Sequence, residues 1–262
     1  MKAKTLLAAA AAAMSVSAFA DLSVAATNVL CRIALTTSEK EVLIGLPLVD
    51  VGGTTQTINA TNYVSTTGLS TDDMLLGKVN GEWKAWSVQG GKWTAASVTI
   101  DNKTFCASDR DSFDRGGAVR FVKSSDPDGS YTIYLYGQVA DAGLNGANPE
   151  STASRSSSGI TYTLMSNLNP ASKTLEAMNF DGLASGDKIA LLSSNGTGQK
   201  EYFYNGTAWM QKTYTTVTNS TWLVETTYLQ ETDTDASSVA IAAGQGFWFI
   251  ATKGTESVTA NW

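Results

Sequence analysis

The sequence predicts an all-β protein made of two tandem, diverged β-sandwich-like repeats that follow a cleaved signal peptide. Three observations support this prediction. Short apolar and aromatic runs are separated by turns rich in Gly, Asn and Asp, which is typical of strands in sandwiches and barrels. A set of landmarks occurs twice in the same order, which indicates an internal repeat. The N-terminus has the layout of an export signal.

The export signal occupies the first 20 residues. Lys2 and Lys4 form a basic start, residues 6–16 form a short apolar core, and residues 18–20 match an A-x-A cleavage site. The mature chain is therefore expected to begin at Asp21, with an uncleaved N-terminal anchor as the alternative. No later stretch is apolar over about 18 residues, so no transmembrane helix is expected.

Composition argues against a nucleic-acid partner and against much enzyme chemistry. Of the 18 Lys and Arg residues, Lys2 and Lys4 are removed with the signal peptide. The mature chain then has 16 Lys and Arg and 24 Asp and Glu residues, which gives a net charge of −8. An acidic surface repels nucleic acid. The chain contains no His, the commonest general base and metal ligand. We therefore expect no nucleic-acid partner and no enzyme.

The two cysteines, Cys31 and Cys106, belong to a chain that is expected in an oxidising compartment. One disulfide between them is the simplest expectation. It would join the N-terminal segment to the first repeat and stabilise the fold by up to about 4 kcal/mol, because it restricts the unfolded chain. Two buried free thiols are the alternative.

Four landmarks occur in both halves of the chain. They are an apolar run that ends near Pro, a Gly-Leu turn that ends in Asp, a Trp after a tight turn, and a glycine pair before an apolar strand. Their positions are 43–47 and 164–170, 68–73 and 182–187, 90–93 and 205–209, and 116–122 and 244–250. The predicted division is an N-terminal strand segment (21–40), β repeat 1 (41–140), a linker (141–159) and β repeat 2 (160–262).

Local signals within the repeats favour hairpins. Asn80-Gly81 lies between two apolar runs and predicts a two-residue type I′ turn. Asp128-Gly129 leads into residues 131–136, which alternate as a strand does. Residues 175–178 are the one place where a single helical turn is expected.

The order of these landmarks resembles a module of uncharacterised secreted bacterial tandem-repeat β proteins. In that module an apolar strand ends in Leu-Pro or Asn-Pro, a Gly-Leu-x-x-Gly-Asp turn and a Trp hairpin follow, and a Gly-x-Gly-aromatic strand closes the repeat. The matching residues are Leu46-Pro47 and Asn169-Pro170, Asp73 and Asp187, Trp93 and Trp209, and residues 243–249. The resemblance covers residues 42–125 and 160–254, and it implies an exported adhesive or structural protein.

The first copy departs from this pattern, since Arg120 replaces Trp248 and Asp72 replaces Gly186. The second copy is therefore the better candidate for binding. Its aromatic residues are expected to form a ligand-binding face, because exposed rings on a rigid sheet stack on sugars or partner surfaces. The alternative is that these rings are core residues. The candidates are Tyr202, Tyr204, Trp209, Phe247 and Trp248.

No cofactor is expected, with weak Ca²⁺ binding as an alternative. Three acidic clusters, at residues 109–114, 126–129 and 231–235, offer the oxygen ligands that Ca²⁺ prefers. None of them matches the EF-hand loop, and polar turns explain them as well. Paired carboxylates for glycoside hydrolysis are a further alternative, Asp187 with Glu201 or Asp73 with Glu82. The aspartates lie in turns, where such side chains cap their own backbone.

These observations predict an exported protein, in the periplasm, at the cell surface or outside the cell, with a non-catalytic role in binding or adhesion. Its expected partner is an extracellular glycan or a surface protein. A structural subunit of an extracellular assembly is the first alternative, through self-association or through donation of a strand from residues 21–35. An outer-membrane β-barrel is the second, because Val258, Ala260 and Trp262 alternate at the C-terminus.

Overall fold

The computed structural model of the chain describes residues 30–49, 57–59, 63–79, 82–100, 103–106, 112–114, 117–139, 150–168, 171–192, 199–221 and 224–261. The elements that lie wholly within these residues are β-strands, apart from a short 3-10 turn, η1 (Glu176–Met178), at the position predicted for a helical turn. The predicted all-β class is therefore confirmed. The predicted signal peptide lies outside the described residues.

The first half of the chain forms a three-stranded sheet in the order β1-β11-β3, a six-stranded sheet in the order β2-β10-β5-β6-β7-β8, and the pair β4-β9. We call this half repeat 1. Its strands are β1 (Leu30–Thr37), β2 (Glu41–Gly45), β3 (Leu48–Val49), β4 (Thr57–Asn59), β5 (Met74–Val79), β6 (Glu82–Gln89), β7 (Lys92–Ile100), β8 (Lys103–Cys106), β9 (Ser112–Asp114), β10 (Ala118–Val122) and β11 (Tyr131–Val139).

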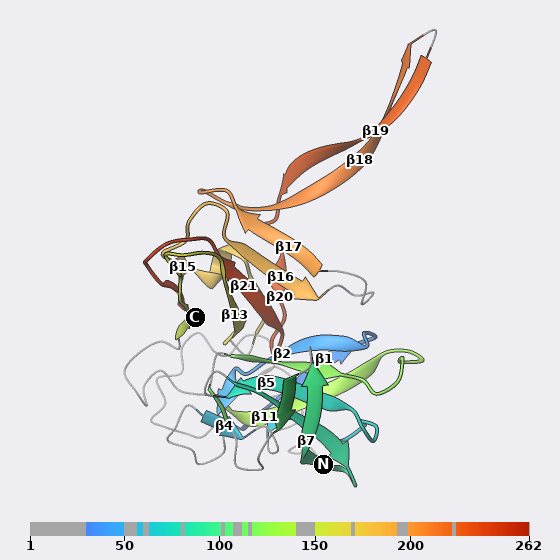
Figure 1. Cartoon of the computed structure of the whole chain (residues 1–262), viewed down its shortest axis with the longest axis vertical. Helices are drawn as coiled ribbons and strands as arrows, with labels where there is room; N and C mark the ends of the chain where they lie inside the picture. The colour runs from blue at the N-terminus through green and yellow to red at the C-terminus, as the bar shows by residue number, and fades with distance from the viewer. Residues whose placement is uncertain are drawn as a thin grey trace, which may run out of the picture.

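The second half, repeat 2, has sheets in the orders β12-β22-β15 and β13-β21-β16-β17-β18-β19, and the pair β14-β20. Its strands are β12 (Glu150–Ala153), β13 (Thr161–Ser166), β14 (Lys173–Thr174), β15 (Phe180–Asp181), β16 (Lys188–Leu192), β17 (Gln199–Tyr204), β18 (Trp209–Thr221), β19 (Val224–Asp235), β20 (Ala240–Ile241), β21 (Gly246–Ala251) and β22 (Val258–Asn261). The two halves lie one above the other in Figure 1.

The same pairing order recurs in the two six-stranded sheets, and the register corresponds residue by residue. Arg120 lies opposite Leu43 of β2, and Trp248 lies opposite Leu164 of β13. The predicted boundaries omit the first strand of each repeat. β1 lies in the segment predicted as 21–40 and pairs with β11, while β12 lies in the predicted linker and pairs with β22.

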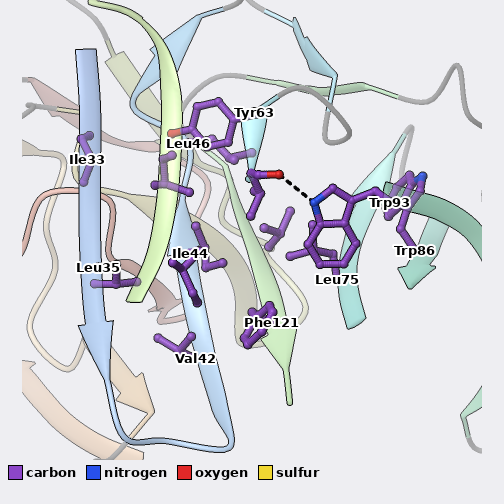
Figure 2. Close-up of a cluster of buried hydrophobic side chains, with 14 of the residues drawn as sticks. Ile33, Leu35, Val42, Ile44, Leu46, Tyr63, Leu75, Trp86, Trp93 and Phe121 are labelled. Atoms are coloured by element: carbon purple, nitrogen blue, oxygen red, sulfur yellow. Dashed lines mark hydrogen bonds between the residues drawn. The ribbon is translucent and has the colours of Figure 1, made fainter. Parts of the chain in front are cut away.

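Each repeat buries its apolar side chains in one core shared by its two sheets, as the layers of a sandwich do. In repeat 1, Ile33 and Ile133 from the three-stranded sheet join Ile44 and Phe121 from the six-stranded sheet. Figure 2 shows part of this core, where the indole N–H of Trp93 donates a hydrogen bond of 2.7 Å to a backbone carbonyl. Burial of each large side chain contributes about 1.5–3 kcal/mol to folding.

The predicted turns account for the hairpins that bring these strands together. Val79 lies opposite Glu82, as expected if Asn80-Gly81 forms a two-residue turn, although the turn itself lies outside the described residues. Gly90 and Gly91, between β6 and β7, both have positive φ, at 57° and 73°. Two positive φ angles define a type I′ turn, which glycine adopts without strain.

The repeats contact each other through the ends of corresponding strands. The Gly45 N–H donates to the Gly244 carbonyl at 2.8 Å. A Cβ on Gly45 would lie 2.5 Å from the Cβ of Ser166, and a Cβ on Gly246 would lie 2.5 Å from the Cβ of Ala118. Gly45 corresponds to Ser166 and Ala118 to Gly246, so like positions face each other, as in an interface with two-fold symmetry. The glycines permit this close approach.

The hairpin of β18 and β19 extends well beyond the rest of its sheet. β17 pairs only with the first two residues of β18, whereas β18 and β19 pair from Met210 opposite Asp235 to Thr221 opposite Val224. The outer part therefore projects from repeat 2 as a two-stranded arm (Figure 1). We call residues 213–221 and 224–232 the arm.

Candidate functional site

The predicted aromatic face of repeat 2 is divided between the two sides of the sheet. Tyr202, Trp209 and Phe247 are core residues with exposed fractions of 2%, 3% and 0%, so their predicted role in ligand binding is wrong. Tyr204 is half-buried beside them, with its ring 5.7 Å from that of Trp209. Trp248 points the other way, because successive residues of a strand face opposite sides. It alone of the five predicted residues lies on the solvent side of the sheet.

The solvent side of this sheet, which we call the outer face, carries aromatic residues that the sequence did not single out. Tyr162 lies opposite Ile250, and Ile250 lies opposite Lys188. Lys188 in turn lies opposite Phe203, which lies opposite Met210. These residues form one row across β13, β21, β16, β17 and β18.

The row continues along β18 onto Lys212 and Tyr214, which share the outer side of that strand with Met210. Tyr162 and Tyr214 stand at the two ends of the row with 61% and 59% of their surface exposed. Phe203 follows the buried Tyr202, and the two-residue alternation of a strand could have predicted that Phe203 lies on the outer side. Tyr162 and Tyr214 could not be found in this way, because their strands lack a clear apolar alternation.

Two adjoining hollows follow the row and share Gly186, Lys188 and Glu201 in their walls. The smaller, of about 190 Å³, extends towards Tyr162 and Ile250. The larger, of about 430 Å³, extends towards Phe203, Lys212 and Tyr214. We call the two together the outer groove. Its floor combines ring faces and aliphatic surface with charged groups.

The charged groups of the outer groove are paired with one another. The ammonium of Lys188 lies 2.9 Å from a carboxylate oxygen of Glu201. Lys212 pairs with Glu231, and this hydrogen bond raises the pKa of Lys212 and lowers the pKa of Glu231. The Lys212 ammonium also lies 5.9 Å from the ring centroid of Phe203. These pairs place donors and acceptors beside the rings.

The corresponding row of repeat 1 contains no aromatic residue. Glu41, Val122, Met74 and Ser87 form the row that corresponds to Tyr162, Ile250, Lys188 and Phe203. Arg120, in the place of Trp248, pairs with Glu41. An aromatic row is therefore a property of repeat 2 alone among the described residues of these sheets.

Asp187 and Asp73 are buried structural residues. Asp187 has no exposed surface, and it accepts hydrogen bonds from the N–H groups of Ala184 at 2.8 Å and Thr252 at 2.9 Å. The Arg155 guanidinium donates to both of its carboxylate oxygens. The predicted capping of the turn backbone is thus confirmed.

Asp73 is held in the same way in repeat 1. It accepts from the N–H groups of Ser70 at 2.8 Å and Ser124 at 2.9 Å, and from the ammonium of Lys123 at 2.9 Å. Burial raises the pKa of both aspartates, but the hydrogen bonds outweigh it and the pKa of each is lowered. Buried, ionised carboxylates cannot reach a substrate or supply a proton. The alternative that Asp73 or Asp187 belongs to a pair of hydrolytic carboxylates is therefore wrong.

The predicted disulfide is not formed. Cys31 is a free thiol on β1, in the three-stranded sheet, where it lies opposite Gly137. Cys106 lies on β8, the outermost strand of the six-stranded sheet. Pairing depends on which strands become neighbours, which the spacing of the cysteines does not reveal. Burial raises the pKa of the Cys31 thiol.

The acidic clusters considered for Ca²⁺ are dispersed or engaged. Asp126 pairs with Lys40 at 2.8 Å, Glu231 pairs with Lys212, and residues 109–111 lie outside the described residues. In the part of the chain that the structure describes, no group of three or more His, Cys, Asp or Glu side chains could hold a metal ion. The described residues also contain no helix long and apolar enough to cross a membrane.

No family model, curated protein or solved structure matches this chain. The choice of site therefore depends on the geometry of the outer face. That geometry offers ring surfaces and hydrogen-bonding groups side by side on one sheet, which are the elements of a recognition site.

Proposed function

We propose that this protein is an exported, non-catalytic carbohydrate-binding protein that binds glycans on the outer face of repeat 2. The observation that supports this proposal is the row of Tyr162, Ile250, Lys188 and Phe203 across neighbouring strands. Sugar rings present flat C–H faces that stack on aromatic side chains, while their hydroxyls bond to charged groups at the edge. Export is inferred from residues 1–20.

A glycan array probed with the mature chain, residues 21–262, tests the proposal. Tyr162→Ala and Trp248→Ala are expected to weaken binding about tenfold, since each removes a stacking surface worth about 1–3 kcal/mol in comparable contacts. Tyr136→Ala is the matched control, because Tyr136 is 43% exposed but lies on β11, in the three-stranded sheet of repeat 1. An array without specific binding, or equal losses in Tyr162→Ala and Tyr136→Ala, would contradict the proposal.

A structural subunit of an assembly is the second candidate, and the arm is the observation that favours it. Tyr214 and Leu229 on the arm are 59% and 70% exposed. A two-stranded hairpin is marginally stable alone, so contact with another chain would stabilise it. Donation of β1 is not needed, since β1 pairs with β11 of its own chain. Sedimentation that stays monomeric at all concentrations would exclude assembly of the purified protein through the arm.

A further inference from the structure

The sheet of repeat 2 opens where β18 leaves β17. β17 pairs with only the first two residues of β18, Trp209 and Met210. The rest of β18, residues 211–221, has β19 as its one partner among the described strands. The larger hollow of the outer groove lies in this opening, since its walls come from residues within 200–203 of β17 and 211–214 of β18. One edge of β18 is therefore unpaired, and we call it the free edge.

The hydrogen bonds at the base of the hairpin show which backbone groups point to the free edge. The Ala236 N–H donates to the Trp209 carbonyl at 2.8 Å, so the backbone of Trp209 faces β19. In an antiparallel strand the backbone groups of successive residues point to alternate sides. The odd-numbered residues of β18 therefore bond to β19. Lys212, Tyr214 and the further even-numbered residues up to Ser220 present their N–H and C=O groups to the free edge.

The two long edges of the arm differ in charge. From Thr213 to Thr221, β18 has no charged residue and consists largely of Thr, with Tyr and Val, which favour strands. β19 carries Glu225, Glu231 and Asp233. Charged residues protect the exposed edge of a sheet against pairing with another chain. The edge of β19 has this protection and would repel a copy of itself, whereas the free edge of β18 would not.

Length also distinguishes the free edge. β18 has 13 residues, whereas β2, β8 and β13, at the ends of the six-stranded sheets, have five, four and six. A long edge offers more backbone hydrogen bonds to a partner strand. A two-stranded hairpin is marginally stable alone, and sheets of three or more strands are more stable. Pairing along β18 would therefore satisfy the backbone of the arm and stabilise it.

We propose that two copies of this chain dimerise by antiparallel pairing of their free β18 edges. The two arms then form a four-stranded sheet in the order β19-β18-β18-β19. A two-fold axis at Val217 places Tyr214 opposite the partner's Ser220 and Thr216 opposite the partner's Thr218, residues whose backbone groups point to the free edge. Both copies use the same edge, so the contact closes at a dimer and leaves the acidic β19 edges outside.

This inference goes beyond the proposed function, because the pairing does not depend on glycan binding. Analytical ultracentrifugation of the mature chain over a range of concentrations tests it, with a reversible monomer–dimer equilibrium as the expected result. Thr218→Pro removes an N–H that points to the free edge and leaves the bonds to β19 in place. It is expected to raise the dissociation constant of the dimer at least about tenfold.

Thr227→Pro is the matched control. Thr227 lies directly opposite Thr218, and its N–H points to the outer edge of β19. The same substitution therefore has the same local effect on the arm, but it should leave the dissociation constant unchanged. Circular dichroism of both variants shows whether the strands are retained.

Thr216→Lys tests the free edge without removing a backbone group. Thr216 is exposed, and two such lysines would lie diagonally across the paired strands, where like charges repel. This variant is also expected to be monomeric at concentrations where the unchanged chain is dimeric. It keeps the proposal testable if proline distorts the arm.

Four results would overturn the proposal. They are a mature chain that is monomeric at every concentration, a dimer that persists in both Thr218→Pro and Thr216→Lys, equal weakening by Thr218→Pro and Thr227→Pro, and growth beyond a dimer. The glycan array separates this inference from the proposed function. An array without binding would leave the dimer in place, and a monomeric chain would leave glycan binding in place.

Discussion

Asp73 and Asp187 occupy the same place in the two repeats, yet their cations come from different positions. Ser124 donates its N–H to Asp73, and the residue before it, Lys123, supplies the cation. Thr252 donates its N–H to Asp187 in the same way, but the residue before it is Ala251, which has no charge. Repeat 2 instead uses Arg155, which follows β12. A buried carboxylate needs a counter-ion, and either position can provide it. The two halves therefore meet this requirement with different residues.

Loss of the Arg155 guanidinium is expected to destabilise the protein strongly. Arg155→Met leaves the Asp187 carboxylate buried without its cation, which costs about 3–5 kcal/mol in free energy of unfolding. Urea unfolding at neutral pH measures this cost. Arg32→Met is the control, because Arg32 is exposed on β1 and the contact of its guanidinium with the Tyr134 ring is worth about 0.5–1 kcal/mol. Similar midpoints for the two variants would contradict the importance of the buried pair.

Stability is expected to fall in acid because of the same two aspartates. The folded state lowers the pKa of Asp73 and Asp187, so the unfolded chain binds protons first as the pH drops. Their contribution is complete above the unfolded pKa of about 3.9 and is lost as the pH falls towards the folded pKa values. The free energy of unfolding from urea titrations should thus decline below about pH 5. A constant value down to pH of about 3 would show that the aspartates do not contribute.

At the scale of elements, the strands of the six-stranded sheets have one buried and one exposed side, whereas the described side chains of the arm, at residues 213–217 and 229–232, are exposed or half-buried. At the base of the arm, the Thr213 hydroxyl donates to the Thr232 carbonyl of the opposite strand at 3.0 Å, and just before the arm the Thr234 hydroxyl donates to the Gln211 carbonyl at 3.2 Å. The arm therefore depends on its own cross-strand contacts.

Shortening the arm is expected to leave the rest of the fold intact. Thr216 lies opposite Leu229, so residues 217–228 can be replaced by Asn-Gly in register. The apparent Tm should change by less than about 4 °C, which corresponds to about 1 kcal/mol in a chain of this size. Lys212 and Tyr214 remain, so glycan binding should also remain. A large loss of Tm would show that the arm contacts the body of the protein in solution.

At the scale of the molecule, the two repeats share an interface of small residues. Gly246→Ala places a Cβ 2.5 Å from that of Ala118, which requires the repeats to shift apart. We expect a loss of about 1–3 kcal/mol, and calorimetry should show the single transition broadening or dividing in two. Gly129→Ala is the control, since no atom lies within 4 Å of the added Cβ. An unchanged thermogram for Gly246→Ala would mean that the interface tolerates separation.

The all-β class, the hairpin turns and the capping role of the turn aspartates follow from local chemistry. Two-residue periodicity and the conformational freedom of glycine act over a few residues, so they can be recognised in the chain itself. The same local patterns placed Trp248 and Phe247 on adjacent positions with opposite orientations. They did not reveal which of the two faces the core.

Long-range pairing decided the rest. The order of strands in the sheets brought Tyr162, Lys188 and Phe203 into one row and separated Cys31 from Cys106. It also paired two segments predicted to lie outside the repeats, β1 with β11 and β12 with β22. Register and layer packing depend on contacts between residues far apart in sequence, so they cannot be predicted from the residues next to each position in the chain. The outer face therefore exists only when the sheets are assembled.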